Sequence, residues 1–121
     1  MELKPNETNV GINPKNLIAS EEVMKIVLND EVKDTVTLEE RQAKKGGSFE
    51  QYKLFLEDEH KTLRVANYLF RRQLNNLFDN YGEHTESWAG NYVVLKGVTD
   101  GDYFALEIEA CAVPPWVGMK V

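Results

Sequence analysis

One stretch of this chain departs from the hydrophobic period of the segments around it, and this departure constrains the fold more than any other feature. Up to residue 68, apolar side chains alternate with polar ones, most clearly in FEQYKLFLED (49–58). From Leu69 to Tyr81 they recur at spacings of three and four, and Gly82 follows. Alternation is typical of strands with one buried face, whereas the wider spacing is typical of an amphipathic helix, which a glycine often ends. The alternation returns near residue 91. The pattern therefore predicts strands on both sides of one helix.

Five strands are expected, three before the helix and two after it. The first is long, and a bulge or bend near Asn29-Asp30 divides it. The expected strands cover residues 23–42, 49–58, 62–68, 91–98 and 103–113. The order β-β-β-α-β-β within 121 residues is that of the oligonucleotide-binding (OB) barrel, whose helix closes one end. We therefore predict an all-β fold with one helix, a five-stranded OB-like β-barrel.

The flanks of this barrel differ from it in composition. Residues 1–18 are rich in Asn, Pro and Gly, which predicts a flexible N-terminal arm. Residues 19–113 form the expected barrel domain, and residues 114–121 form a C-terminal tail that carries Trp116. No apolar run reaches the roughly 20 residues of a membrane span, and the N-terminus has no signal-peptide core. We expect a soluble, cytoplasmic protein that does not bind a membrane.

Charge is distributed unevenly along the chain. The net charge is −6, yet residues 41–72 carry eight basic and four acidic side chains. This basic segment falls on the second and third expected strands and on the loops beside them. A negative net charge disfavours binding of nucleic acid, whereas a local basic patch favours it. Ordinary solvated surface is an equally good explanation of the patch.

Signals for catalysis, metal binding or cofactor binding are weak. His60 and His84 lie on separate expected turns, without the spacing of metal ligands. The acidic run at 57–59 has oxygen ligands of the kind that Mg²⁺ prefers, but a charged hairpin turn explains it more simply. The single cysteine, Cys111, excludes an internal disulfide and is expected to be a small buried thiol rather than a nucleophile. We predict no enzymatic activity, no metal and no cofactor.

The alternation assigns the side chains of the second and third strands to two faces. The residues expected inside the barrel are Leu54, Leu56, Leu63 and Val65, and those expected outside are Lys53, Phe55 and Arg64. An exposed ring between two cations suits a single strand of nucleic acid, because bases stack on the ring and phosphates pair with the cations. OB proteins bind at this face and at the loops joining strands 1–2 and 4–5. We predict a site for single-stranded nucleic acid, DNA in preference to RNA, formed by Arg41, Lys44, Lys45, Lys53, Phe55, Lys61, Arg64 and Tyr103.

Other interpretations of these residues remain open. The N-terminal arm or a second copy of the chain would cover Phe55, and the lysines would then serve only solubility. The loop TDGDY (99–103) is acidic and opposes phosphate, although its tyrosine can still stack. In another class of function, the chain is a protein-interaction module that uses the barrel and Trp116 as an anchor on a protein partner or in a homodimer.

The segment after the helix carries the spaced motif Tyr81-Gly82-x-x-Thr85-x-x-Trp88-x-Gly90-x-x-Val93-x-Leu95. Its residues are first explained as a corner, in which Gly82 ends the helix and Trp88 fills the end of the barrel. The motif also resembles one in small, mostly uncharacterised proteins of phages and other mobile elements, over residues 63–108. That family has a lysine where this chain has Asn91, so no basic contact is carried over to this position. The resemblance implies a small β-barrel associated with replication or recombination.

Overall fold

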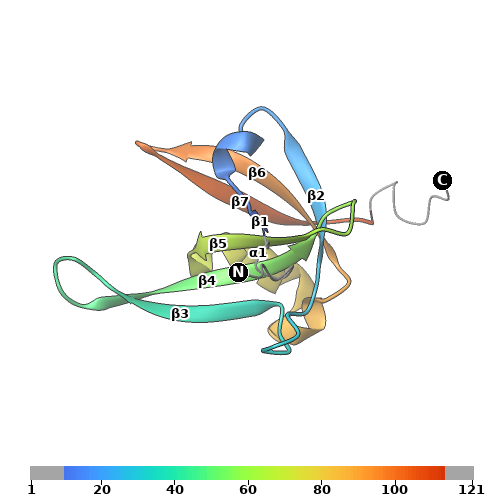
Figure 1. Ribbon diagram of the computed structural model, residues 1–121, viewed down its shortest axis with the longest axis horizontal. Helices are drawn as coiled ribbons and strands as arrows, with labels where there is room; N and C mark the ends of the chain where they lie inside the picture. Colours follow the sequence, from blue (N-terminus) through green and yellow to red (C-terminus); the bar gives the residue numbers. More distant parts are fainter. Residues whose placement is uncertain (1–9, 114–121) are drawn as a thin grey trace, which may run out of the picture.

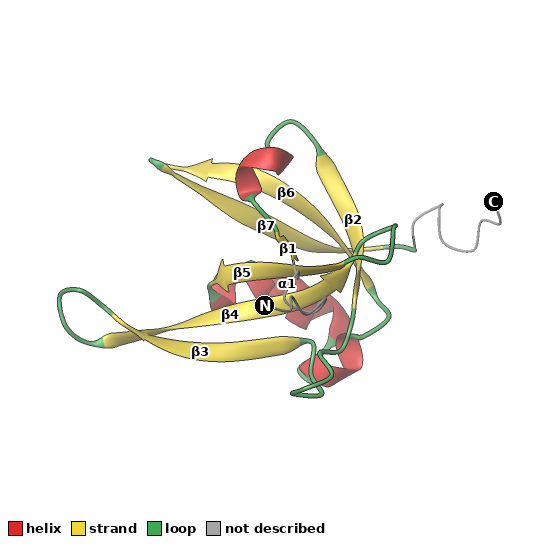
Figure 2. Cartoon of the chain, in the orientation of Figure 1, coloured by secondary structure: helices red, strands yellow, loops and turns green. Residues whose placement is uncertain are grey.

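Strands make up about half of the computed structural model, which describes residues 10–113 (Figure 1, Figure 2). The strands are β1 (Val10–Gly11), β2 (Glu21–Ile26), β3 (Val36–Gln42), β4 (Ser48–Glu57), β5 (Leu63–Leu69), β6 (Tyr92–Asp100) and β7 (Tyr103–Cys111). The helix of this part of the chain is α1 (Arg71–Tyr81), and two short 3₁₀ turns are η2 (Pro14–Leu17) and η3 (Thr85–Trp88). The prediction of a mostly β fold with one α-helix is confirmed.

All these strands belong to one curled sheet. Its order is β1-β5-β4-β2-β6-β7, and β3 pairs with β4 as a branch. Every pairing is antiparallel apart from that of β1 with β5. Within residues 10–113, β5 and β7 are not paired with each other, so the sheet is open between them. The predicted closed barrel of five strands is therefore not confirmed, because the sheet has additional strands and an open side.

The predicted first strand is divided, as expected, into β2 and β3. The Asn29 side chain accepts hydrogen bonds from the backbone N–H groups of Glu31 and Val32, and Asn29 forms a bridge with Asp34. These bonds turn the chain between the two strands. β2 then pairs mainly with β6, while β3 pairs with β4. One bent segment thus contributes to both halves of the sheet.

Residues 10–18 differ from the predicted flexible arm, because they are part of the fold. β1 pairs with β5, and the N–H of Ile12 donates to the carbonyl of Val65 at 3.0 Å. η2 contacts β6 and β7, and Leu17 is buried there. The segment thus spans the open side of the sheet from β5 to β6. The rest of the predicted arm (1–9) and the tail (114–121), with Trp116, lie outside the described residues.

The core lies between the inner face of the sheet and one face of α1. The fully buried side chains include Leu54 and Leu56 of β4 and Val93 of β6. The helix contributes Leu74 and Leu77, at the spacing of three that its sequence shows. The predicted inner face of β4 is therefore confirmed.

The segment after α1 forms the corner that its sequence predicts. Gly82 ends the helix with φ +93°, which suits a residue without a Cβ. Trp88 is fully buried, and its indole N–H donates to the carbonyl of Gly82 at 3.0 Å. The Thr85 hydroxyl donates to the Asp34 carboxylate at 2.7 Å and so ties the corner to the bend before β3. These contacts explain the Tyr-Gly…Thr…Trp spacing structurally.

Polar side chains of α1 bind the outer edge of β7. The Gln73 amide donates to the carbonyl of Leu106 at 2.8 Å, and the N–H of Ala110 donates to the Asn76 side-chain oxygen at 2.7 Å. These bonds satisfy backbone groups that a neighbouring strand would otherwise bind. Neither α1 nor any other helix of the described residues is long and apolar enough to cross a membrane.

Gly97 of β6 should be required for the N-terminal segment to dock. A Cβ at this position would overlap the carbonyl oxygen of Pro14 and lie 3.1 Å from the backbone nitrogen of Ile18. We expect Gly97→Ala to lower the free energy of unfolding by about 1–3 kcal/mol in a urea titration. Gly11→Ala is the control, because its Cβ meets only the Asn67 side chain, at 3.2 Å. Wild-type stability of Gly97→Ala would contradict the docking.

Tyr81 should make stability depend on pH in the alkaline range. Its hydroxyl donates to the carbonyl of Tyr92 at 2.6 Å, and burial raises the pKa of the phenol above its ordinary value of 10.0. A group whose pKa is raised in the folded state contributes its full stabilisation of the fold at pH values below its unfolded pKa. This contribution is lost as the pH rises through the folded pKa. We expect the free energy of unfolding to fall more steeply above pH 10.0 in the wild type than in Tyr81→Phe. Parallel pH profiles would exclude this contribution.

Candidate nucleic-acid interface

The outer face of β4 carries two of the predicted site residues. Alternation along the strand directs Lys53 and Phe55 away from the core, and both side chains are half-buried. They line one shallow hollow together with Val65 and Asn67 of β5. The predicted association of a cation with an aromatic ring on this face is therefore present.

Arg64 does not share this face. The antiparallel register places Val65 opposite Phe55 and Arg64 opposite Leu56, and residues directly opposite project from the same face of a sheet. The sequence-based prediction put Leu63 and Val65 inside and Arg64 outside. Leu63 is instead 46% exposed, and Val65, although buried as predicted, lies on the outer face opposite Phe55. The predicted faces of β5 were therefore wrong by one residue, because pairing with β4, not the alternation of β5 itself, sets the phase.

The remaining predicted cations lie at opposite ends of β4. Lys44 and Lys45 are exposed in the turn between β3 and β4, whereas Lys61 and Arg64 lie at the turn between β4 and β5. The ten residues of β4 separate these turns by about 30 Å. Arg64 lies 3.7 Å from the Asp58 carboxylate, which offsets its charge. The structure thus does not bring the predicted basic stripe together.

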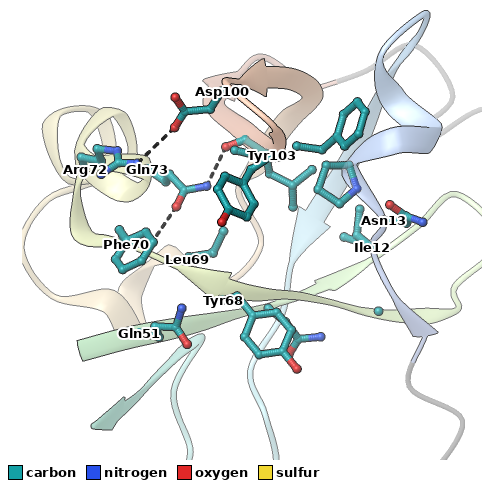
Figure 3. A pocket seen from close by; sticks show the side chains of 16 residues that line it. Ile12, Asn13, Gln51, Tyr68, Leu69, Phe70, Arg72, Gln73, Asp100 and Tyr103 are labelled. Carbon is teal, nitrogen blue, oxygen red and sulfur yellow. Dashed lines mark hydrogen bonds and ion pairs between the residues drawn. The ribbon is translucent and has the colours of Figure 1, made fainter. Parts of the chain in front are cut away.

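A cleft of about 690 Å³ lies at the open side of the sheet (Figure 3). The β3–β4 and β6–β7 hairpins extend in the same direction, to the left in Figure 1, and the cleft lies near this end. Its walls come from the N-terminal segment, β4, β5, the first turn of α1 and the β6–β7 hairpin. The lining residues are Gly11, Ile12, Asn13, Pro14, Gln51, Asn67, Tyr68, Leu69, Phe70, Arg72, Gln73, Asp100, Tyr103, Phe104, Ala105 and Leu106.

Exposed aromatic side chains surround this cleft. Tyr68 is 64% exposed and Tyr103 is 78% exposed, and Figure 3 shows them on facing walls, from β5 and from the β6–β7 hairpin. Phe70 and Phe104 also line the cleft and are exposed. Phe49, on the β3–β4 hairpin, contacts Phe70 with 6.3 Å between ring centroids. Aromatic rings in such number on an open surface are more typical of a binding site than of unspecific surface.

A cation lies over three of these rings. The Arg41 guanidinium is 5.2 Å from the ring centroid of Tyr68, and the Arg72 guanidinium is 5.3 Å from that of Phe70. The Lys15 ammonium is 5.2 Å from the ring centroid of Phe104. The predicted residue Arg41 thus lies beside the cleft through Tyr68, and its guanidinium also pairs with the Glu39 carboxylate at 3.2 Å.

The backbone of Tyr68 is left-handed, with φ +59°. This conformation costs a residue with a side chain about 1–2 kcal/mol. The register between β4 and β5 shifts at this point, since Tyr52 pairs with Leu69 but Leu54 with Ala66. Tyr68 is thus the bulge of β5. Strained residues of this kind occur frequently at binding sites.

Tyr103 of the cleft and Arg41 beside it were predicted from the sequence, whereas Tyr68, Phe70 and Phe104 were not. A signal for two of them was present in the run NYLF (67–70). Three large apolar side chains in succession at a strand end cannot all face the core, because alternation directs only every second one inward. Their exposure was therefore foreseeable, but their convergence on one cleft was not.

Residues 10–113 hold no group of three or more His, Cys, Asp or Glu side chains arranged to bind a metal ion. Burial raises the pKa of the Cys111 thiol, so the thiol is protonated at neutral pH. His60 and His84 are each on the surface beside a glutamate, at 3.5 and 3.8 Å. The aromatic cleft is thus the feature that best suits a ligand.

Comparisons of this chain with family models, with curated proteins and with solved structures found no match. The assignment of a ligand therefore depends on the geometry of the cleft itself.

Tyr68→Gly tests whether the ring contributes to stability. Glycine relieves the left-handed strain of about 1–2 kcal/mol. The variant loses the cation–π contact with Arg41, which contributes about 0.5–1 kcal/mol. Glycine also loses more backbone entropy on folding than tyrosine does, which costs a similar amount. We expect the free energy of unfolding to stay within about 1 kcal/mol of the wild type in a urea titration. A much larger loss would show that Tyr68 is mainly a structural residue.

Proposed function

We propose that this protein binds single-stranded nucleic acid, DNA in preference to RNA, without catalysing a reaction. The observation that carries the proposal is the set of three cation–aromatic pairs at the cleft. Each pair offers a ring on which a base stacks and a positive charge for the neighbouring phosphate. Stacking of one base contributes about 1–3 kcal/mol. The hollow with Lys53 and Phe55 extends this surface along β4, since Asn67 lines both the hollow and the cleft.

The strand order supports the same proposal. With β1 set aside and β2 and β3 taken as one bent strand, the order of pairing is β5-β4-β2-β6-β7, with α1 between β5 and β6 in sequence. We infer an OB-like barrel that is open between its third and fifth strands. OB proteins bind single strands on the second and third strands, between the loops that join strands 1–2 and 4–5. In this chain those are β4, β5, the turn with Lys44 and Lys45, and the turn before Tyr103.

The preference for DNA rests on the resemblance of the Tyr81–Leu95 motif to proteins of phages and mobile elements, which implies a role in replication or recombination. Acidic groups limit the expected affinity. Asp100 lies 3.8 Å from Arg72 at the cleft, and the chain has a net charge of −6. Such a field opposes the approach of a polyanion. We expect modest affinity that decreases strongly with salt.

A protein-interaction module is the second candidate. Leu28, Val32 and Leu38 are 45%, 50% and 56% exposed, and Val32 lines the hollow beside Phe55. Exposed apolar side chains near a hollow suit a protein partner or a second copy of the chain. If this candidate is correct, the chain self-associates or binds another protein, and it does not bind oligonucleotides.

The test is fluorescence anisotropy with a labelled oligothymidylate of about 20 nucleotides, at about 50 mM and about 200 mM salt. We expect saturable binding that weakens at the higher salt. Tyr68→Ala, Tyr103→Ala and Phe55→Ala should each weaken binding by about fivefold or more, because each removes a stacking ring.

Two control variants probe the opposite end of β4. His60→Gln removes an exposed ring, and Lys61→Gln removes an exposed charge, and neither residue lines the cleft or the hollow. Both should bind almost as the wild type does. If the wild type does not bind at the lower salt, or if the control variants lose as much affinity as the ring variants, the proposed site is wrong.

A further inference from the structure

Two amide side chains of the cleft have no hydrogen-bond partner among the described residues. Gln51 of β4 and Asn67 of β5 are half-buried and line the cleft, yet neither makes a side-chain hydrogen bond within residues 10–113. Other polar side chains there are engaged. Gln73 accepts from the N–H of Phe70 at 2.7 Å and donates to Leu106. The Arg72 guanidinium lies 3.8 Å from Asp100.

Amides at such partly exposed positions can take water or a ligand as their hydrogen-bond partner. Each primary amide offers two donors and an acceptor with two lone pairs. A carboxylate, a phosphate or an ammonium ion would use only one of these functions. A nucleobase edge uses both, because it presents donors and acceptors side by side.

The rings next to these amides are placed to hold such a base. Figure 3 shows Tyr68 and Tyr103 on facing walls of the cleft, which Gln51 also lines. Tyr103 comes from the β6–β7 hairpin and Tyr68 from the bulge of β5. A flat group that enters between them is stacked on at least one face, and its edge meets the amides.

We propose that the cleft takes one base of the bound strand between Tyr68 and Tyr103, and that Gln51 and Asn67 hydrogen-bond to the edge of this base. The proposal rests on the proposed binding of single-stranded nucleic acid and adds to it a dependence on the identity of the base. The cleft volume of about 690 Å³ is within the range of small-molecule sites and admits a nucleotide. Asn67 also lines the hollow with Lys53 and Phe55, so the neighbouring nucleotides continue along β4.

The test compares labelled oligonucleotides of about 20 nucleotides made of dA, dC or dT alone, and a dT strand with a central abasic tract. The variants are Gln51→Leu and Asn67→Ala, and the control is Gln42→Leu, which removes an exposed amide of the same hairpin that does not line the cleft. The measured quantity is the ratio of dissociation constants between strands. Because all the strands carry phosphates, a general change in attraction to phosphate alters each dissociation constant by a similar factor and leaves the ratio unchanged.

We expect the wild type to bind its best homo-oligonucleotide about fivefold or more tightly than its worst, and the abasic strand more weakly than the intact one. Gln51→Leu and Asn67→Ala should bring the ratios nearer to one, whereas Gln42→Leu should leave them unchanged. Equal binding of all strands by the wild type, or unchanged ratios in both cleft variants, would overturn base recognition and leave the proposed strand binding intact. Failure of every strand to bind would overturn both proposals.

Discussion

The open side of the sheet, between β5 and β7, is the constraint on which the rest of the structure depends. The outer edge of a strand carries backbone N–H and C=O groups that need partners. β5 satisfies part of its edge with β1 and with the N–H of Ile12. β7 satisfies part of its edge with the side chains of Gln73 and Asn76 from α1. Since each edge has its own partners, the two strands remain apart, and the cleft lies at the opening.

The helix and most strands were predictable, because each carries its own hydrophobic period. α1 begins and ends within two residues of the stretch from Leu69 to Tyr81 in which the spacing of three and four was recognised. The N-terminal segment was not predictable in this way. A two-residue strand and one 3₁₀ turn are too short to show a period, and they are held by β5 and β6. Closure of the barrel likewise depends on contacts between distant segments, which local alternation does not contain.

The candidate site was predictable in part for the same reason. Lys53 and Phe55 were assigned to the correct face. Leu54 and Leu56 both have to face the core, and alternation then directs Lys53 and Phe55 outward. In β5, alternation alone allowed either set of alternate side chains to face the core. Pairing with β4 selected the set that the sequence did not favour. The convergence of rings from β5, from Phe70 just before α1 and from the β6–β7 hairpin on one cleft required the fold to be known, because the hairpin is distant in sequence from the other two.

The bulge at Tyr68 links the fold to the candidate site. Two residues of β5, Asn67 and Tyr68, lie against one residue of β4, Lys53, so one residue must leave the alternation. With Ala66 inside, regular alternation would direct Tyr68 into the core and Leu69 to the surface. The left-handed backbone of Tyr68 reverses this, so Leu69 is 1% exposed and the tyrosine ring lies outside under Arg41. Glycine or asparagine would form the same bulge with less strain. The bulge therefore does not require a tyrosine, and the exposed ring is available for the binding proposed at the cleft.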